Sequence, residues 1–280
     1  MSGGTRKPTL VAKVATHAFL VIFTAATLFP VVMVVKKSLS AGQEFALTLS
    51  PIPEQPTLQH FRDVIGHQLF PRQLLNSLIA ALGTTIVGVF LACTAAYAFS
   101  RFRFPGHRGF LLIFLVVQMF PGSLLMIPLY VLMDKLGLLD QVLGLVLVYS
   151  TTAIPFCVWM LKGYFDTIPK ELEEAARIDG ASRFRIFYDI VLPLSRPAIA
   201  VTALFSFMTA WNEFILASTF TSRESAYTLP VLLQHYVGEH TTEWGHFAAG
   251  AIIVSIPVMV LFYILQKHLV AGLTSGSVKG

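Results

Sequence analysis

Long runs without charged residues constrain this chain more than any other feature of its sequence. No Asp, Glu, Lys or Arg occurs in five runs, residues 14–35, 73–100, 109–133, 141–161 and 246–266. A sixth apolar run, residues 197–220, contains a single charged residue, Glu213. An α-helix of about 20 apolar residues crosses the hydrocarbon core of a bilayer. The runs therefore predict an all-α integral membrane protein with six transmembrane helices in one domain, residues 1–280.

Composition supports a membrane protein and argues against other classes. Hydrophobic residues make up 55% of the chain and charged residues 12%, whereas soluble domains average about 25% charged. The two cysteines, Cys93 and Cys157, lie inside apolar runs and are expected to be small packing residues, without a disulfide framework or metal-ligand spacing. The basic residues are not gathered into one patch, so we expect no nucleic-acid partner.

The distribution of Lys and Arg predicts the orientation in the membrane. With a cytoplasmic amino terminus, the inner segments hold 14 of these residues and the outer segments 6. Cytoplasmic loops carry an excess of Lys and Arg, so the count favours six spans with both termini in the cytoplasm. The first run is too long for the apolar core of a signal peptide and is expected to remain as a span.

Two segments interrupt the pattern of simple spans and loops. Residues 36–72 are mixed in composition and predict an external loop with a short helix around His60 to Ile65. Within the third run, residues 118–123 (Gln-Met-Phe-Pro-Gly-Ser) break regular helix geometry. Such a break fits a discontinuous helix beside a transport path, and it equally fits a kink that serves only packing.

Residues 162–196 form the longest charged segment between two spans, with six basic and six acidic residues. Residues 170–179 are mostly good helix formers, Gly180 can adopt the left-handed conformation that ends a helix, and Ser182 can cap the next. Pro193 is expected to stop that second helix. A helical hairpin with little apolar surface needs a partner to dock against; local chemistry alone allows a solvated loop equally well.

A longer pattern in the same segment distinguishes these two interpretations. The chain reads Glu-Ala-Ala, three residues, Gly, nine residues, Ile, one residue, Leu-Pro between positions 174 and 193. This resembles the signature loop of binding-protein-dependent ABC importer permeases. The similarity continues in Arg101-Phe-Arg-Phe-Pro-Gly, Gln118-Met-Phe-Pro, Lys162-Gly-Tyr-Phe and the last nine residues, and it is closest to the G-type subunits of maltose/maltodextrin importers.

The resemblance implies a type I ABC importer fold, a function and a set of partners. The chain would be a transport subunit for maltose or maltodextrins in a bacterial or archaeal cytoplasmic membrane. It would pair with an F-type permease, two ATPase subunits and an extracytoplasmic sugar-binding protein. The ATPase-coupling residues would be Glu174, Ala175, Ala176, Asp179, Gly180, Ile190, Leu192 and Pro193, and the ATPase-contacting tail Ser275, Gly276, Ser277, Val278, Lys279 and Gly280.

Glu213 is the candidate for a translocation path. An ionisable group inside a span is costly and usually functional. Residues 202, 206, 209 and 213 follow helical spacing and predict a polar stripe, in which Thr209, Asn212 and Glu213 would line the path. Alternatively, these polar groups satisfy backbone carbonyls or pair with a neighbouring subunit.

The external segment 234–245 occupies the position that family members present to their binding protein. Tyr236, Glu239 and Trp244 are the candidate contacts, since exposed aromatic groups suit a sugar or a protein partner. Tyr236 and Trp244 could instead be interfacial anchors at the membrane edge.

The sequence contains no recognisable catalytic motif. The sequence holds no Gly-x-x-x-x-Gly-Lys-Ser/Thr loop, so ATP and Mg²⁺ are expected on partner subunits and no cofactor on this chain. The histidines show no metal-ligand grouping in sequence. Two alternatives stay open: a permease for another oligosaccharide, and an ion-coupled secondary carrier or channel acting alone. A carrier usually needs more buried charge than one glutamate.

Overall fold

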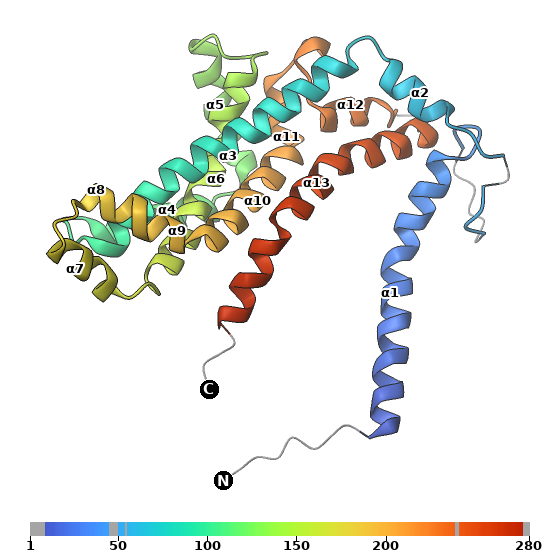
Figure 1. The fold of residues 1–280 in the computed structure, drawn as a ribbon. Coiled ribbons are helices and arrows are strands. Elements are labelled where there is room, and N and C mark those ends of the chain that lie inside the picture. The colour runs from blue at the N-terminus through green and yellow to red at the C-terminus, as the bar shows by residue number, and fades with distance from the viewer. Residues whose placement is uncertain (1–8, 45–49, 54, 239–240, 277–280) are drawn as a thin grey trace. The chain divides into compact units, whose positions relative to one another are not determined.

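The computed structural model describes residues 9–44, 50–53, 55–238 and 241–276. In these residues the regular structure is helical, with two isolated β-bridges and no strand (Figure 1). Four helices are long and apolar enough to cross a membrane, or up to six spans if each of two bent helix pairs counts as one. The prediction of an all-α membrane protein is confirmed.

The predicted spans correspond to helices that differ in bounds and in continuity. The uninterrupted spans are α1 (Leu10–Ser38), α3 (Phe70–Arg101), α6 (Val142–Phe165) and α13 (Trp244–Gly276). The third run forms α4 (His107–Met119) and α5 (Gly122–Lys135), which meet at a bend of 102°. The break predicted at residues 118–123 is therefore present, because Pro121 cannot continue the hydrogen bonding of α4. The fifth run is also broken, into α10 (Arg196–Trp211) and α11 (Ile215–Phe220).

The chain separates into two compact units. Unit 1 comprises residues 1–67 and 233–253, and unit 2 comprises residues 68–232 and 254–280. Unit 1 holds α1, the short helix α2 (Gln59–Gly66) predicted at His60 to Ile65, and the first part of α13. Residues 10–32 of α1 are exposed, which suits a helix that lies in lipid or against another subunit.

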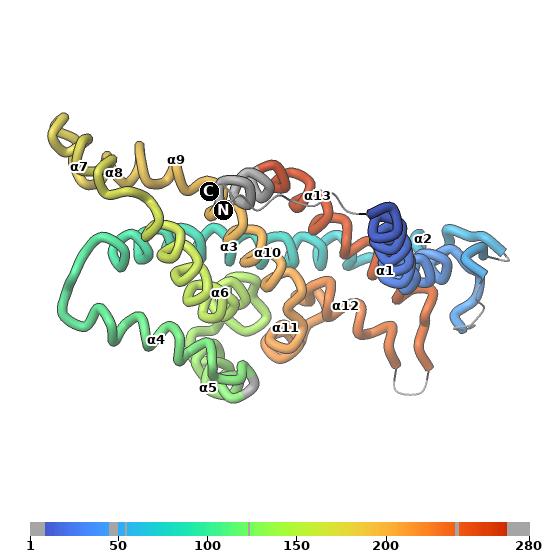
Figure 2. Tube along the Cα trace, turned by 90° about the horizontal axis from the view of Figure 1, so that it is seen from below, coloured from blue at the N-terminus to red at the C-terminus, as the bar shows by residue number. Residues whose placement is uncertain are grey.

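Unit 2 is built around α3, against which α6 and α10 pack (Figure 2). The contact face of α3 carries a row of small residues spaced four apart: Ala80, Thr84, Gly88, Ala92 and Ala96. A Cβ at Gly88 would lie 3.6 Å from Ser206 Oγ and 3.9 Å from Ala153 Cβ. Small residues allow membrane helices to approach closely where the hydrophobic effect between helices is absent.

The core at one end of unit 2 includes both cysteines. Cys93 and Cys157 pack with Phe99, Leu161 and Phe165, all of them buried. The prediction that the cysteines are packing residues is confirmed. Their thiols lie in apolar surroundings, where free cysteine behaves as a small hydrophobe.

The last helix extends beyond the apolar run 246–266 that predicted the sixth span. Helix α13 continues through Gly272 and ends at Gly276. A helix that is already formed extends at little cost, one hydrogen bond for each residue added, so a short Gly- and Ser-containing stretch continues it. Residues 277–280, the rest of the predicted ATPase-contacting tail, lie outside the described residues.

Candidate functional site

The Glu-Ala-Ala segment folds as a helical hairpin, residues 170–194, at the end of unit 2 that the last turns of α3 reach (Figure 1). Its first helix is α7 (Lys170–Ile178) and its second begins as α8 (Arg183–Ile186). Gly180 has a φ of 85° between them, and the Ser182 side chain accepts a hydrogen bond of 3.3 Å from the Arg185 amide. Both features were predicted from sequence, and both are confirmed.

The predicted stop at Pro193 lies one residue before the observed end of the helical segment, Leu194. After α8 the chain widens into a π-helical turn, η1 (Phe187–Val191), and continues as α9 (Leu192–Leu194). Pro193 lacks the N–H that would bond to the preceding turn, and the helical segment ends one residue later, at Leu194. The chain turns at Ser195, where the helical segments on either side make an angle of 77°.

A buried ion pair attaches the hairpin to α3. Arg101 Nε lies 2.5 Å from Glu173 Oε1, and each side chain is only 6% exposed. Tyr97 donates a hydrogen bond of 3.3 Å to Glu173 Oε2, and Arg101 also donates one of 3.2 Å to the Ile168 carbonyl. Breaking such a pair by removing one partner typically costs about 3–5 kcal/mol. The base of the hairpin is thus rigidly held.

Asp166, just before the hairpin, adds a second attachment. Its carboxylate accepts hydrogen bonds of 2.6 Å from Ser100 Oγ and 2.6 Å from Lys162 Nζ. Burial raises the pKa of Asp166, but the hydrogen bonds from Lys162 and Ser100 and the nearby positive charges outweigh it, so the pKa is lowered. The residue is therefore ionised at neutral pH.

The far side of the hairpin exposes apolar side chains. Leu172 is 46% exposed, Tyr188 63%, Phe184 76% and Ile178 87%. Phe184 and Tyr188 stack with their ring centroids 6.4 Å apart. Large exposed apolar groups on a projecting element are typical of a protein-interaction surface.

The predicted coupling residues occupy different parts of this hairpin. Those that face outward are Glu174, Ala175, Asp179 and Gly180; those that are half-buried are Ala176, Ile190, Leu192 and Pro193. Glu173, the residue that anchors the hairpin, was missed. A single sequence does not reveal which carboxylate acquires a buried partner. The one available signal is that Glu173 and Ala176 are spaced i, i+3, as residues on one face of a helix are.

The second candidate region is the break between α10 and α11. Glu213 does not continue a helical face, since α10 ends at Trp211; its Oε1 accepts a hydrogen bond of 2.8 Å from the Leu216 amide at the start of α11. Thr202 and Ser206 are buried, whereas Thr209 and Asn212 are exposed and donate to the Phe205 and Met208 carbonyls. Thr202, Ser206 and Thr209 keep the predicted helical spacing within α10, but the predicted stripe does not extend to Glu213, which lies in the break between α10 and α11.

Asp140, in the loop between α5 and α6, connects this loop to the segment that follows α11. This contact was not predicted from the sequence. Its carboxylate accepts hydrogen bonds of 2.7 Å from the Ser222 amide and 2.9 Å from the Arg223 amide. Burial raises the pKa of Asp140, but these two bonds and the Arg223 charge outweigh it and lower the pKa. Asp140 has a φ of 58°, a left-handed conformation that Asp tolerates better than most residues.

In unit 1, the predicted binding-protein contacts are only partly described. Tyr236 is half-buried and lies 5.4 Å from the His246 ring, measured between centroids. Trp244 is 39% exposed and begins α13, with its amide 3.1 Å from the Gln43 carbonyl. Glu239 lies outside the described residues.

Comparison with known proteins identifies the family. The family model described as "Binding-protein-dependent transport system inner membrane component" matches residues 85–275. The chain belongs to this family. It is a multi-pass transport component of the membrane and not an enzyme. The matched region includes the Glu-Ala-Ala hairpin and both broken helix pairs.

Individual relatives extend over nearly the whole chain. The maltose/maltodextrin transport system permease protein MalG of Escherichia coli K12 is 40% identical over 283 residues, which covers 95% of each chain. The galactooligosaccharides transport system permease protein GanQ of Bacillus subtilis 168 is 38% identical over 269 residues, again 95% of each. A crystal structure of a bacterial ABC transporter that imports alginate matches with a TM-score of 0.80 and 24% identity, covering 94% of this chain and 99% of that one.

Proposed function

We propose that this family member is the G-type membrane subunit of an ATP-driven importer for maltose or maltodextrins. The similarity to MalG over almost the full length supports the sugar class. GanQ, at nearly the same identity, makes another oligosaccharide the principal alternative. Membership in a binding-protein-dependent family favours this function over an ion-coupled carrier acting alone.

The observation that carries the coupling role is the hairpin itself. Its base is held to α3 by the buried Arg101–Glu173 pair, and its outer surface presents Ile178, Phe184 and Tyr188. A closing ATPase dimer that binds this surface would move α3 with it, because the ion pair and the Asp166 bonds leave the base no independent motion. We therefore propose that the hairpin docks on one of two partner ATPase subunits. The tail, residues 275–280, would make an additional contact.

The complete importer would contain an F-type permease, two ATPases and an extracytoplasmic sugar-binding protein. Tyr236, Glu239 and Trp244 would contact the binding protein, and Thr209, Asn212 and Glu213 would line the path or its interface with the F-type subunit. Discontinuous helices are a recurrent way to expose polar groups at a transport path, which supports this position for the latter group. ATP and Mg²⁺ would bind only to the partners, and both termini would lie in the cytoplasm.

Reconstitution with the partner subunits tests the proposal. Vesicles that contain the complex, with binding protein and sugar on the outside and ATP inside, should take up maltose or maltotriose. Galactooligosaccharides, trehalose and alginate oligomers serve as competing substrates. Ile178→Asp should abolish uptake without preventing membrane insertion. Uptake of a different sugar would reject the maltose assignment, and full uptake by the Ile178→Asp complex would reject the docking role.

A further inference from the structure

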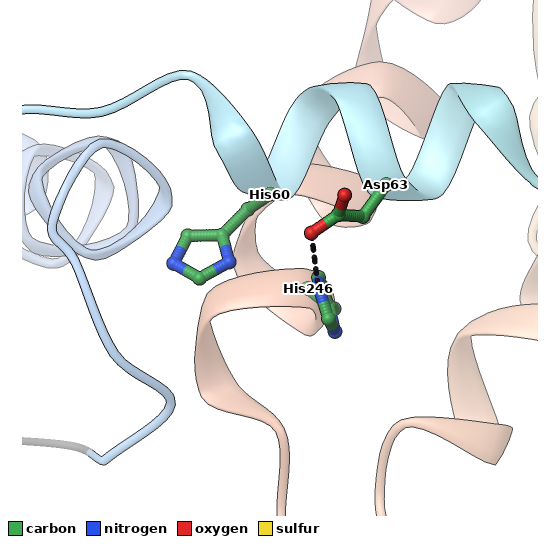
Figure 3. A group of neighbouring side chains, drawn as sticks. All are labelled: His60, Asp63 and His246. Carbon is green, nitrogen blue, oxygen red and sulfur yellow. Dashed lines mark hydrogen bonds and ion pairs between the residues drawn. The ribbon is translucent and has the colours of Figure 1, made fainter.

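Unit 1 contains a cluster of three potential metal ligands that is unrelated to the hairpin. His60 and Asp63 lie on one face of α2, three residues apart, and His246 lies in the first turn of α13 (Figure 3). One ligand atom from each residue lies within 4.8 Å of the others. His246 is more than 180 positions from His60 and Asp63 in the sequence, so only the fold reveals the group.

The hydrogen bonds of the two histidines leave one ring nitrogen of each directed to the cluster. His60 is 4% exposed, and its Nε2 lies 2.9 Å from the Ser40 carbonyl, which can only accept a hydrogen bond. The proton is thereby placed on Nε2 and the lone pair on Nδ1. His246 Nδ1 lies 2.6 Å from Glu243 Oε2, an acceptor that places the proton on Nδ1.

This arrangement creates a conflict at the remaining nitrogen of His246. Its Nε2 lies 3.2 Å from Asp63 Oδ2, as the dashed line in Figure 3 marks. A neutral imidazole has one N–H, so it cannot donate to two carboxylates at once. Two electron pairs therefore face each other across the Nε2–Oδ2 contact unless a cation lies between them or the ring carries a second proton.

We propose that this cluster binds a zinc ion through His60 Nδ1, His246 Nε2 and Asp63 Oδ2. Two ligands at the usual zinc distances of about 2.0–2.1 Å in a tetrahedron are about 3.3 Å apart, close to the 3.2 Å seen between Asp63 and His246. Two imidazoles and one carboxylate suit zinc, whereas Ca²⁺ and Mg²⁺ prefer oxygen ligands alone. A water molecule would complete the tetrahedron.

The residues around the three ligands would hold them in position for a metal ion. Metal-bound histidines usually donate their other N–H to a carboxylate or a backbone carbonyl, and here Glu243 and Ser40 provide one of each. Gly245 leaves room for His60, since a Cβ at this position would overlap the His60 ring. Gln43 Oε1 accepts hydrogen bonds of 2.9 and 3.3 Å from the amides of Gly245 and His246, which positions the first turn of α13. The Gln43 amide nitrogen also lies 3.1 Å from His246 Nδ1, 3.3 Å from His246 Nε2 and 3.5 Å from His60 Nδ1. Zinc would displace it from the last two nitrogens, which are the proposed ligand atoms.

The bound ion would connect α2 to the start of α13. Both elements belong to unit 1 and are already joined by the polar contacts of Gln43, Asp63 and His246 described above. The site goes beyond the transport function, because neither the hairpin nor the α10–α11 break takes part in it. Its consequence is local: zinc would fix the position of residues 242–246 against α2.

The test uses the full chain in detergent, purified with a tag that lacks histidine and stripped of metal with EDTA. Zinc titrated in competition with a chromophoric chelator should bind one ion per chain with a Kd in the micromolar range or tighter. Asp63→Asn should weaken binding at least tenfold, and His246→Gln at least as much. His235→Gln, in the same unit but outside the cluster, is the matched control and should bind as the unchanged chain does.

Asp63 is 46% exposed, so Asp63→Asn keeps the fold and decides the outcome even if a histidine variant misfolds. Cobalt provides a second readout on the unchanged chain: tetrahedral Co²⁺ should give intense visible bands that zinc removes. Failure of the unchanged chain to bind zinc would overturn the proposal, as would equal affinity in Asp63→Asn; the Asp63–His246 contact would then be an ordinary imidazolium–carboxylate pair.

Discussion

The Arg101 guanidinium and the Glu173 carboxylate lie 2.5 Å apart, and both side chains are almost completely buried. They join the last turn of α3 to the first helix of the Glu-Ala-Ala hairpin. Separating this pair is costly, because a charge removed from its partner in this position cannot be solvated.

Glu173→Gln is expected to loosen the hairpin by about 3–5 kcal/mol, the typical cost of leaving a buried charge unpaired. Amide exchange in residues 170–194 should accelerate, and stimulation of the partner ATPase by substrate should fall. Glu171→Gln, on the exposed side of the same helix, is the control and should change neither quantity. The double variant Arg101→Met/Glu173→Met should recover most of the protection, since a hydrophobic pair replaces the ions without unpaired charge. Equal exchange in Glu173→Gln and the unchanged chain would contradict the anchoring role.

Substitutions at Gly180 should act through the backbone alone. A Cβ built at Gly180 meets no atom within 4 Å beyond the residue and its two chain neighbours, so the surrounding space is open, but at a φ of 85° a Cβ crowds the local backbone. Asn should be tolerated best, Ala should cost about 1–2 kcal/mol, and Val more. ATPase stimulation in the reconstituted complex should follow this order while membrane insertion is unchanged. A severe defect in Gly180→Asn would show that a partner fills the space around Gly180.

Asp140→Asn should release the Ser222–Arg223 turn in a pH-dependent manner. The folded pKa of Asp140 lies below its ordinary value, so ionisation stabilises the fold above the unfolded pKa of about 3.9 and the contribution disappears as pH falls through the folded value. At pH 7 the Ser222 and Arg223 amides should therefore exchange faster in Asp140→Asn than in the unchanged chain. The difference should diminish below pH 4. A difference that does not depend on pH would attribute the effect to geometry and not to charge.

Glu213 should have a capping role that is separable from its charge. Glu213→Gln keeps an acceptor for the Leu216 amide, whereas Glu213→Leu removes it at a cost of about 0.5–2 kcal/mol. If the charge serves the path, both variants should assemble and lose transport, with Leu worse. If Glu213 holds the F-type partner, the Leu variant should fail to co-purify. Normal transport and assembly in both variants would show that Glu213 serves only to cap the start of α11.

The orientation prediction can be tested by labelling. Single cysteines at Ser182 and Thr241, both exposed, should react with a membrane-impermeant maleimide from opposite sides of the membrane. The background needs Cys93→Ala and Cys157→Ala, which fit because both sites are small and buried. Labelling of both positions from outside would reject the six-span topology.

The sequence predicted features that arise from local chemistry. The helices follow from apolar runs, the turn at Gly180 from its conformational freedom, and the break near Pro121 from the missing N–H. Features that depend on distant contacts were missed or wrongly placed. Glu173, Asp140 and the His60–Asp63–His246 cluster each acquire their partners only after folding, and the end of α10 at Trp211 moved Glu213 from a helix face to a cap.

The row of small residues along α3 has a mechanical consequence. Large side chains lock neighbouring helices by interdigitation, and each displacement then requires new rotamers. Ala80, Gly88, Ala92 and Ala96 present only hydrogens and methyl groups to α6 and α10, so this surface has low relief. Helices that meet across such a surface can shear past one another in small steps while they remain in contact. The same small residues that allow the helices of unit 2 to pack closely would therefore also let these helices slide past one another with little steric resistance.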